Sequence, residues 1–443
     1  PMFEKWSFWY AFFRPYFYFS FWLFHRKIVV MGKGNIPQDK PVIFAPNHPN
    51  ALHDDLAIVY STPHQVVWLG RADLHKSKFV RSILRFLKII PVYRIRDGKD
   101  NLGQNDATFR TAVKVLHHNK SVAIYPEAEN SLFRSMVTHK KAISRVVFLG
   151  GELTDFKLDT QIVPTGLYFD QSHNFGRRLL VNYGSPISVK DYYPLYRENP
   201  HKATQALRND LETAIRKLVL DYRKPENARG YEAIRAICTT SLLHNKGWKD
   251  TLSNRFLLAR ELAGHLENMN ETEPEKSKHL IQQSLDFETQ LKALGLRHWL
   301  VNIAEEKPVK IILHLCYLLL TFPLFAPGFL FNAIPWFTVN SVAKRKVKNE
   351  IFKGTVTFTL GFLLFPLIYL FQTGIIMPFL PHWYWGFLLL LIFPLAGKFA
   401  HNWYILFLKT RGRWRWLNIK RTKPALYNSI HQAKQEILAL ISY

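Results

Sequence analysis

Residues 46–55, with the sequence PNHPNALHDD, hold the side chains that a general base needs. His48 comes at the end of an expected strand, and Asp54 follows six positions later, where a helix is expected to begin. A carboxylate in that place can accept a hydrogen bond from one ring nitrogen, which fixes the tautomer and leaves the other nitrogen basic. Such a pair is suited to remove the proton of an alcohol or an amine.

Two other interpretations of this segment stay open. A histidine in a turn is often a structural residue that makes ordinary hydrogen bonds. The segment also offers four side chains of metal-ligand type, which are His48, His53, Asp54 and Asp55. We expect no metal here, because the segment lacks the i, i+4 histidine pair of helical metal motifs and no outside ligand cluster is evident.

Three other apolar runs lead to candidate site residues. The run 89–92 is followed by Arg94, whose guanidinium can bind a phosphate through two parallel hydrogen bonds. The run 121–125 is followed by Glu127, which can bond a substrate hydroxyl or hold Arg94; both residues can equally be solvated strand ends. Pro164 lies inside the run 161–166, which indicates an edge strand or a bulge that can border a cleft. Four such signals in one domain favour one shared site.

The elements that must position these residues alternate between short β-rich runs and helical patterns from residue 27 to 225. The expected strands are 28–31, 42–45, 65–69, 121–125, 161–166 and 179–183. The expected helices are 51–60, 76–87, 107–118, 140–149 and 202–221. This alternation predicts an α/β domain with a mixed, mostly parallel sheet flanked by helices, and such sheets bind ligands at strand ends.

In this order and spacing, the segments resemble the four blocks of the glycerophospholipid acyltransferase family, which includes lysophosphatidate and glycerol-3-phosphate acyltransferases. The blocks are Asn47-His48 with Asp54, Pro91-Val92-Tyr93-Arg94, Tyr125-Pro126-Glu127 and Val163-Pro164. The resemblance covers about residues 25–190, and residues 70–73 and 86–98 make it closer to a bacterial branch with a long C-terminal extension.

The sequence departs from the family pattern in three of these blocks. In the second block, Lys88-Ile89 supplies no glycine where the family often has one, and in the third Tyr125 replaces a usual phenylalanine. His53 stands where the family usually has its aspartate, so Asp54 comes one position late and Asp55 is an alternative partner for His48. Ala128 replaces a usual glycine, and Glu129-Asn130 replace a usual hydroxyl residue and arginine.

The resemblance implies acyl transfer without a cofactor. His48 would deprotonate the acceptor hydroxyl, Asp54 would orient the ring and stabilise the imidazolium, and the alkoxide would attack the thioester of an acyl-CoA or an acyl carrier protein. The acceptor would be 1-acyl-glycerol-3-phosphate or glycerol-3-phosphate, while another lipid acceptor, such as an amino-lipid, stays open.

The resemblance also implies the residues that bind substrate. Arg94 would bind the acceptor phosphate, Glu127 would shape the acceptor site, and Pro164 would line the acyl path. Further candidates are Asn47 and Arg71, with Arg96, Lys140 and Lys141 as weaker positions for a phosphate.

The N-terminal segment 2–26 is expected to lie in a membrane interface. Residues 6–24 hold 13 aromatics in 19 positions with Arg14-Pro15 in the middle, which predicts two short interfacial helices; a single tilted span is the alternative. The segment lacks the aliphatic centre and cleavage site of a secretion signal. Pro1 is typical of a residue left by tag cleavage, so we expect the natural chain to begin at Met2.

The rest of the chain is expected to form a catalytic domain at 27–225, a helical connecting module at 226–305 and a membrane region with a basic tail at 306–443. The apolar runs 356–371 and 375–396 predict a transmembrane hairpin flanked by basic clusters. The run 311–337, interrupted by prolines, predicts a re-entrant or interfacial hairpin, with three full spans as the alternative. The basic clusters are expected to be cytoplasmic, and the resemblance to the bacterial branch implies the cytoplasmic face of a bacterial inner membrane.

Charge and cysteine content limit the partners. Lys and Arg total 59 against 33 Asp and Glu, a net charge of +26, which suits membrane lipids, acidic donors and phosphorylated acceptors. We expect no nucleic acid, because the basic residues cluster beside apolar runs and no nucleic-acid motif is found. The two cysteines, Cys238 and Cys316, cannot build a disulfide framework or a thiolate metal site. A lipid-binding protein without turnover is the main alternative to an enzyme.

Overall fold

The computed structural model describes residues 3–75, 77–93, 103–127, 134–170, 175–303, 308–348 and 350–441. The chain divides into two compact units, Pro1–Asp221 and Tyr222–Tyr443. Each unit is described by itself.

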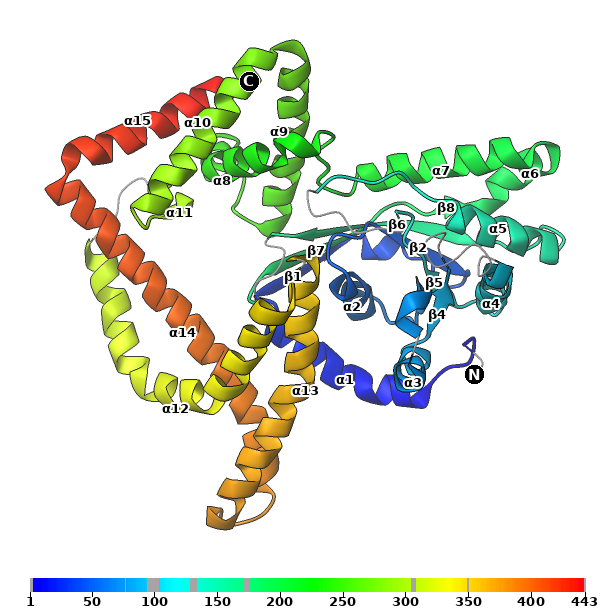
Figure 1. Cartoon of the computed structure of the whole chain (residues 1–443), viewed down its shortest axis with the longest axis horizontal. Coiled ribbons are helices and arrows are strands. Elements are labelled where there is room, and N and C mark those ends of the chain that lie inside the picture. The colour runs from blue at the N-terminus through cyan, green and yellow to red at the C-terminus, as the bar shows by residue number, and fades with distance from the viewer. Residues whose placement is uncertain are drawn as a thin grey trace. The chain divides into compact units, whose positions relative to one another are not determined.

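The first unit is built on one mixed sheet (Figure 1). Its strands are β1 (Lys27–Met31), β2 (Val42–Pro46), β3 (Val67–Arg71), β4 (Ile89–Val92), β5 (Ser121–Ala123), β6 (Gln161–Phe169), β7 (Arg178–Tyr183) and β8 (Ile187–Ser188). They lie in the order β1-β7-β6-β2-β5-β3-β4, with β8 also paired to β6. Neighbours are parallel except where β7 and β8 pair with β6, so the expected mixed, mostly parallel sheet is confirmed.

Helices cover both faces of this sheet, which explains why β2, β5 and β6 are buried along their whole length. One face packs against α4 (Asn105–His117), α5 (Ala142–Leu153) and α7 (Pro200–Arg216). The other face packs near α2 (Leu52–Ser61), where the Ser61 and Tyr183 hydroxyls are 2.6 Å apart. The remaining helices of this unit are α1 (Phe8–Phe24), α3 (Lys78–Phe86) and α6 (Tyr193–Glu198).

All six expected strands are present, with bounds that differ by up to three residues. β4 coincides with the apolar run 89–92 that leads to Arg94, and only β8 was not expected. Pro91 argues against a central strand, and β4 indeed lies at the edge of the sheet, where a missing N–H costs little.

The expectation that Pro164 marks an edge strand or a bulge is wrong. β6 lies inside the sheet, with β2 on one side and both β7 and β8 on the other. Pro164 falls between the residues that pair with β8 and those that pair with β7, and its carbonyl accepts a hydrogen bond from the Gly184 N–H at 2.9 Å. In a strand, the N–H and the carbonyl of one residue point to the same side. At Pro164 this side lies between the segments that pair with β7 and β8, so no partner strand needs the N–H that a proline lacks.

The expectation of two short N-terminal helices is also wrong, because α1 runs without a break through Pro15. A proline inside a helix costs about 3 kcal/mol, so tertiary contacts must offset this loss. Arg14 Nη1 donates to the Pro63 carbonyl at 2.6 Å, and the Tyr18 hydroxyl donates to the Val59 carbonyl at 3.0 Å. These bonds satisfy carbonyls at the C-terminal end of α2, so α1 is fastened to the helix that carries Asp54.

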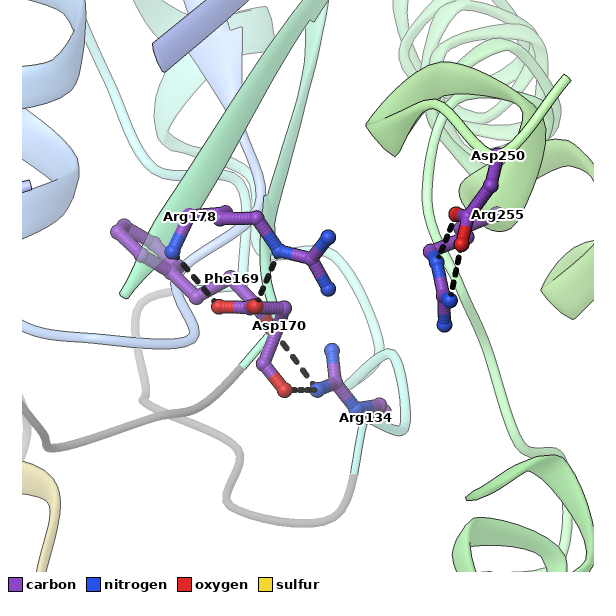
Figure 2. Close-up of polar contacts among 6 residues, drawn as sticks. All are labelled: Arg134, Phe169, Asp170, Arg178, Asp250 and Arg255. Carbon is purple, nitrogen blue, oxygen red and sulfur yellow. Dashed lines mark hydrogen bonds and ion pairs between the residues drawn. The ribbon is translucent and has the colours of Figure 1, made fainter. Parts of the chain in front are cut away.

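The second unit is helical. Its helices are α8 (Ala228–Asn245), α9 (Leu252–Thr272), α10 (Pro274–Ala293), α11 (His298–Val301), α12 (Pro308–Lys346), α13 (Glu350–Ile376), α14 (Trp385–Thr422) and α15 (Pro424–Ile441). Thr251 caps α9 by accepting from the Asn254 N–H at 3.1 Å, and Arg255 in the first turn pairs with Asp250 (Figure 2).

Three helices of this unit, α12, α13 and α14, are long and apolar enough to cross a membrane. The expected break of residues 311–337 into a hairpin is wrong, because α12 is one continuous helix of 39 residues. Its three internal prolines accompany a strong curvature that Figure 1 shows. Asn332 joins the three helices: its amide donates to the Phe393 carbonyl at 3.1 Å, and the Tyr369 hydroxyl donates to its oxygen at 2.5 Å.

Candidate functional site

The four candidate segments meet at one edge of the sheet. The strands β6, β2, β5, β3 and β4 are adjacent and run parallel, so their carboxyl ends lie along the same edge. His48 follows β2, Glu127 follows β5, and Arg71 ends β3. Arg94 and Arg96, which come directly after β4, lie outside the described residues. This edge is where open parallel sheets place their ligands.

His48 and Asp54 form the expected pair. His48 Nδ1 lies 2.9 Å from Asp54 Oδ2. The Asp54 side chain is fully buried, whereas 18% of the His48 side chain is exposed. With Nδ1 donating to the carboxylate, Nε2 is left as the basic atom.

Asp54 is fixed by its place in the first turn of α2. Its Oδ2 also accepts from the Asn50 N–H at 2.7 Å, and a negative charge is favoured at a helix N-terminus. Burial raises the pKa of Asp54, while the bonds from His48 and Asn50 and the charge of Arg177 act in the opposite direction. The buried carboxylate therefore depends on these three groups for its ionised form.

The turn between β2 and α2 has an unusual backbone at Ala51, whose φ is 47°. This left-handed value is costly for a residue with a Cβ atom. The turn holds five residues between His48 and Asp54, and it still brings the two side chains into contact. Strain of this kind is often found beside functional groups.

Asn47 fastens the same turn to β6. Its side chain donates to the Leu167 carbonyl at 3.2 Å and accepts from the Leu167 N–H at 2.7 Å. The amide thus continues the pairing of β2 and β6 beyond the last residue of β2. This contact holds the backbone next to His48.

Tyr125 packs flat against the His48 ring, with the two ring centroids 3.8 Å apart and the planes at 26°. The Tyr125 hydroxyl donates to Asp55 Oδ1. Burial raises the pKa of Asp55 to about 7, while the charge of His48 and the bond from the Tyr125 hydroxyl act in the opposite direction. Asp55 is therefore bonded to Tyr125, and Asp54 is the carboxylate that bonds His48.

The stacked ring gives a prediction for Tyr125. The Tyr125→Ala variant should lower kcat/KM by up to about tenfold, since an aromatic pair contributes about 0.5–1.5 kcal/mol and 1.36 kcal/mol is a factor of ten. Tyr125→Phe keeps the ring and should stay within about threefold of the unmodified protein. Rates measured across pH for both variants check this, and equal losses in the two would contradict a role for the ring.

Glu127 is buried just beyond β5. Only 1% of the residue is exposed, and burial raises the pKa of its carboxyl to about 8. Its Oε1 has no hydrogen-bond partner within the described part of the chain. A carboxyl in this state can donate a hydrogen bond near neutral pH as well as accept one.

The other expected binding residues are placed as follows. The Arg71 guanidinium is bidentate on Asp73, at 3.1 and 2.5 Å, and its side chain is 41% exposed. Pro164 is buried in β6 beside Ala45 of β2. Lys140 and Lys141 are exposed. The chain leading to Arg94 is held by Asn105, whose side chain accepts from the Tyr93 N–H and donates to the Tyr93 carbonyl, both at 2.8 Å.

A second cluster lies where β6 ends (Figure 2). Arg134 donates to the Phe169 carbonyl at 2.8 Å and lies over the Tyr168 ring. Arg178 bonds both carboxylate oxygens of Asp170, through its N–H at 2.7 Å and its Nε at 2.6 Å. These contacts fix the carboxyl end of β6 and the start of β7.

Sequence reasoning missed Tyr125 as a stacking partner and Arg177 beside the pair, and it missed Asn105, which holds Tyr93. Their partners come from distant parts of the chain, so no local spacing reveals them. The arrangement as a whole offers a partly exposed, oriented imidazole beside two protonatable carboxyls, which suits proton transfer from a hydroxyl group.

Residues 27–168 match the protein-family model described as Acyltransferase. The chain is 24% identical over 226 residues to glycerol-3-phosphate O-acyltransferase 2 of Saccharomyces cerevisiae, and 22% identical over 289 residues to glycerol-3-phosphate O-acyltransferase 1 of the same yeast. The matches cover 47% and 61% of this chain but only 27% and 37% of the two relatives, so the chain spans well under half of their length.

Among solved structures, the chain is similar to the crystal structure of the 1-acyl-sn-glycerophosphate acyltransferase PlsC from Thermotoga maritima. The identity is 18%, the match covers 46% of this chain and 78% of that chain, and the TM-score is 0.33.

Proposed function

We propose that this chain, whose residues 27–168 match the Acyltransferase family model, transfers a fatty acyl group from a thioester to a hydroxyl of glycerol-3-phosphate or 1-acyl-glycerol-3-phosphate. The observation that carries the proposal is the 2.9 Å contact between His48 Nδ1 and Asp54 Oδ2 at the carboxyl edge of the sheet. A hydroxyl nucleophile needs such a base near neutral pH.

The transfer proceeds by direct attack. Nε2 of His48 takes the proton of the acceptor hydroxyl, while Asp54 stabilises the imidazolium that forms. The acceptor oxygen bonds to the thioester carbonyl carbon, and the carbon–sulfur bond breaks. The thiolate leaves with the proton from the imidazolium, so the products are an ester and a free thiol. The dyad and the two substrates account for every proton and electron pair.

Substrate binding follows from the charges at the same edge. Arg94, directly after β4, is proposed to bind the acceptor phosphate, with Arg71 as a second cation. Glu127, with a raised carboxyl pKa of about 8, is proposed to hydrogen-bond an acceptor hydroxyl, and Pro164 to border the acyl chain. The donor is an acyl-CoA or an acyl carrier protein; both are acidic and suit a net charge of +26.

The proposed location is the cytoplasmic face of a bacterial inner membrane. The three long apolar helices support a membrane association. Basic residues gather in the last turns of α12 and α14, namely Lys344, Arg345, Lys346, Lys420 and Arg421. Such clusters remain on the cytoplasmic side when a membrane protein inserts. With the basic end of α12 on that side, the proposed location requires the curved α12 to enter and leave the membrane on the same face.

The proposal predicts that thioester consumption depends on the acceptor. Purified protein in detergent, incubated with labelled palmitoyl-CoA or palmitoyl carrier protein, should form an ester with glycerol-3-phosphate or its 1-acyl form. Without an acceptor it should consume no thioester, because no acyl-enzyme is formed. Product masses from a panel that includes an amino-lipid identify the acceptor.

Two results would contradict this proposal. Thioester loss without any acceptor would indicate hydrolysis or an acyl-enzyme. Palmitoyl-CoA binding without product for every acceptor would favour a lipid-binding protein. A Cys238→Ala/Cys316→Ser variant is the matched control, since it removes both thiols and should transfer at an unchanged rate.

A further inference from the structure

Helix α3 (Lys78–Phe86) exposes its apolar residues to an unusual degree. It belongs to the first unit, but none of its side chains is buried. Phe79 is 74% exposed, Ile83 is 42% exposed and Phe86 is 40% exposed. These three residues follow the i, i+4, i+7 spacing of one helix face. A row of large exposed apolar residues is typical of a surface that contacts another molecule or a membrane.

The same helix carries a separate basic stripe. Lys78, Arg81 and Arg85 follow the i, i+3, i+7 spacing and are all exposed. The segment 77–88, SKFVRSILRFLK, contains no acidic residue. Arg81 is steadied by the His75 carbonyl, at 3.3 and 3.2 Å from Nε and Nη2, and no ion pair is found for Lys78 or Arg85 within the described ranges. The stripe is therefore available to a negatively charged partner.

The apolar face of α3 continues onto α1. The rings of Phe13 and Phe86 meet edge to face, with centroids 6.1 Å apart. Next to Phe13, α1 exposes Phe8, Trp9 and Phe12, each 60% exposed. We call the exposed side chains of Phe8, Trp9, Phe12, Phe13, Phe79, Ile83 and Phe86 the aromatic face. It joins two helices that are more than 50 residues apart in sequence.

We propose that the aromatic face and the basic stripe of α3 dock on a lipid surface that contains anionic headgroups. Amphipathic helices with aromatic residues on one side and Lys and Arg on the other bind the interface in this way. A bilayer is also the partner that the rest of the chain favours, because α12, α13 and α14 are long and apolar enough to insert in it. A soluble acidic protein would account for the basic stripe but not for the aromatic face or the three apolar helices.

This docking would act on the site directly. The helix begins seven residues after Arg71, which ends β3 at the carboxyl edge of the sheet. Docking of α3 would therefore bring the headgroup layer to the edge that holds His48. The inference concerns membrane contact and holds whether or not the chain transfers acyl groups.

The test places a polarity-sensitive label on α3 in the full chain. A Cys316→Ser background removes the exposed thiol, and Cys238 stays because it is buried. Phe79→Cys is labelled with a nitrobenzoxadiazole dye and reconstituted in vesicles of phosphatidylcholine, with or without phosphatidylglycerol. Leu153→Cys is the matched control, since Leu153 is a 50% exposed apolar residue on α5. Vesicles that carry doxyl-labelled lipid report contact with the bilayer.

We expect the label at 79, but not the label at 153, to shift to shorter wavelength and to lose intensity with doxyl lipid. The shift should be larger with phosphatidylglycerol and should shrink in Lys78→Glu/Arg85→Glu. The reversal Arg145→Glu/Lys202→Glu, at exposed positions of α5 and α7, changes the charge equally and should leave the shift intact.

Three outcomes would overturn the proposal. A label at 79 that stays in water in both vesicles would show that α3 does not dock. Equal shifts with and without phosphatidylglycerol would show that docking does not depend on anionic headgroups. A label that is already shielded in dilute detergent, and exposed only on further dilution, would show that a second copy of the chain covers this face.

Discussion

The His48→Ala variant should lower kcat/KM for acyl transfer by about 10³-fold, because the general base contributes about 10²–10⁴-fold to such reactions. The side chain is partly exposed, and within the described part of the chain the hydrogen bond of its ring goes to the Asp54 carboxylate. Its removal should therefore leave the fold intact. Transfer rates with saturating palmitoyl-CoA, together with circular dichroism of the purified protein, measure both effects.

Asp54→Asn and Asp54→Ala should show losses of similar size, since an uncharged partner does not stabilise the imidazolium. Asp55→Asn is the matched control: it changes the neighbouring carboxyl, which bonds Tyr125 instead of His48, and should stay within about tenfold of the unmodified rate. Full activity in purified His48→Ala would exclude the mechanism, and a larger loss in Asp55→Asn than in Asp54→Asn would assign the roles the other way.

The sheet and the location of the candidate site could be predicted because their signals are local. Short apolar runs such as 42–45 and 161–166 are typical of strands, and each leads into residues that the topology gathers at one edge. The His48 and Asp54 contact was predicted for the same reason, as both residues belong to one turn. From spacing alone, either Asp54 or Asp55 could be the partner of His48. In the fold, Asp55 bonds Tyr125, which leaves Asp54 as the partner of His48.

What could not be predicted depends on contacts between distant segments. Pro15 and the prolines of α12 were expected to break helices, but packing keeps both helices continuous. For α1, the packing includes the bonds from Arg14 to α2, which lie 45 or more residues away in sequence. A proline inside a helix costs about 3 kcal/mol, and the combined stabilisation from several tertiary hydrogen bonds and buried rings is larger.

Arg177 shows the same dependence on distant contacts at the site itself. It is 1% exposed, it lies between the rings of Phe24 and Phe169 at 5.4 and 4.6 Å, and its charge attracts that of Asp54. Burial lowers the pKa of Arg177 to about 9, whereas Asp54 and Asp170 raise it. In return, the guanidinium lowers the pKa of Asp54, which burial alone would raise further.

The Arg177→Met variant should therefore shift the acid limb of the rate profile to higher pH. Without the cation the pKa of Asp54 rises, so at a given pH more of the carboxyl is protonated and unable to stabilise the imidazolium. Below the new pKa the rate should fall about tenfold for each pH unit, and it should recover as the pH is raised. The loss of a buried charge partner should also cost about 3–5 kcal/mol of unfolding free energy.

The controls for this variant separate charge from packing. Arg177→Lys keeps the positive charge but not the planar group between the two rings, so it should lose stability while its pH profile moves less than that of Arg177→Met. Arg178→Met changes the next residue, which bonds Asp170 at a more exposed position, and should leave the profile in place. If Arg177→Met lost stability with no change in the pH profile, the arginine would serve the fold alone, and the ionised state of Asp54 would rest on His48 and the Asn50 N–H.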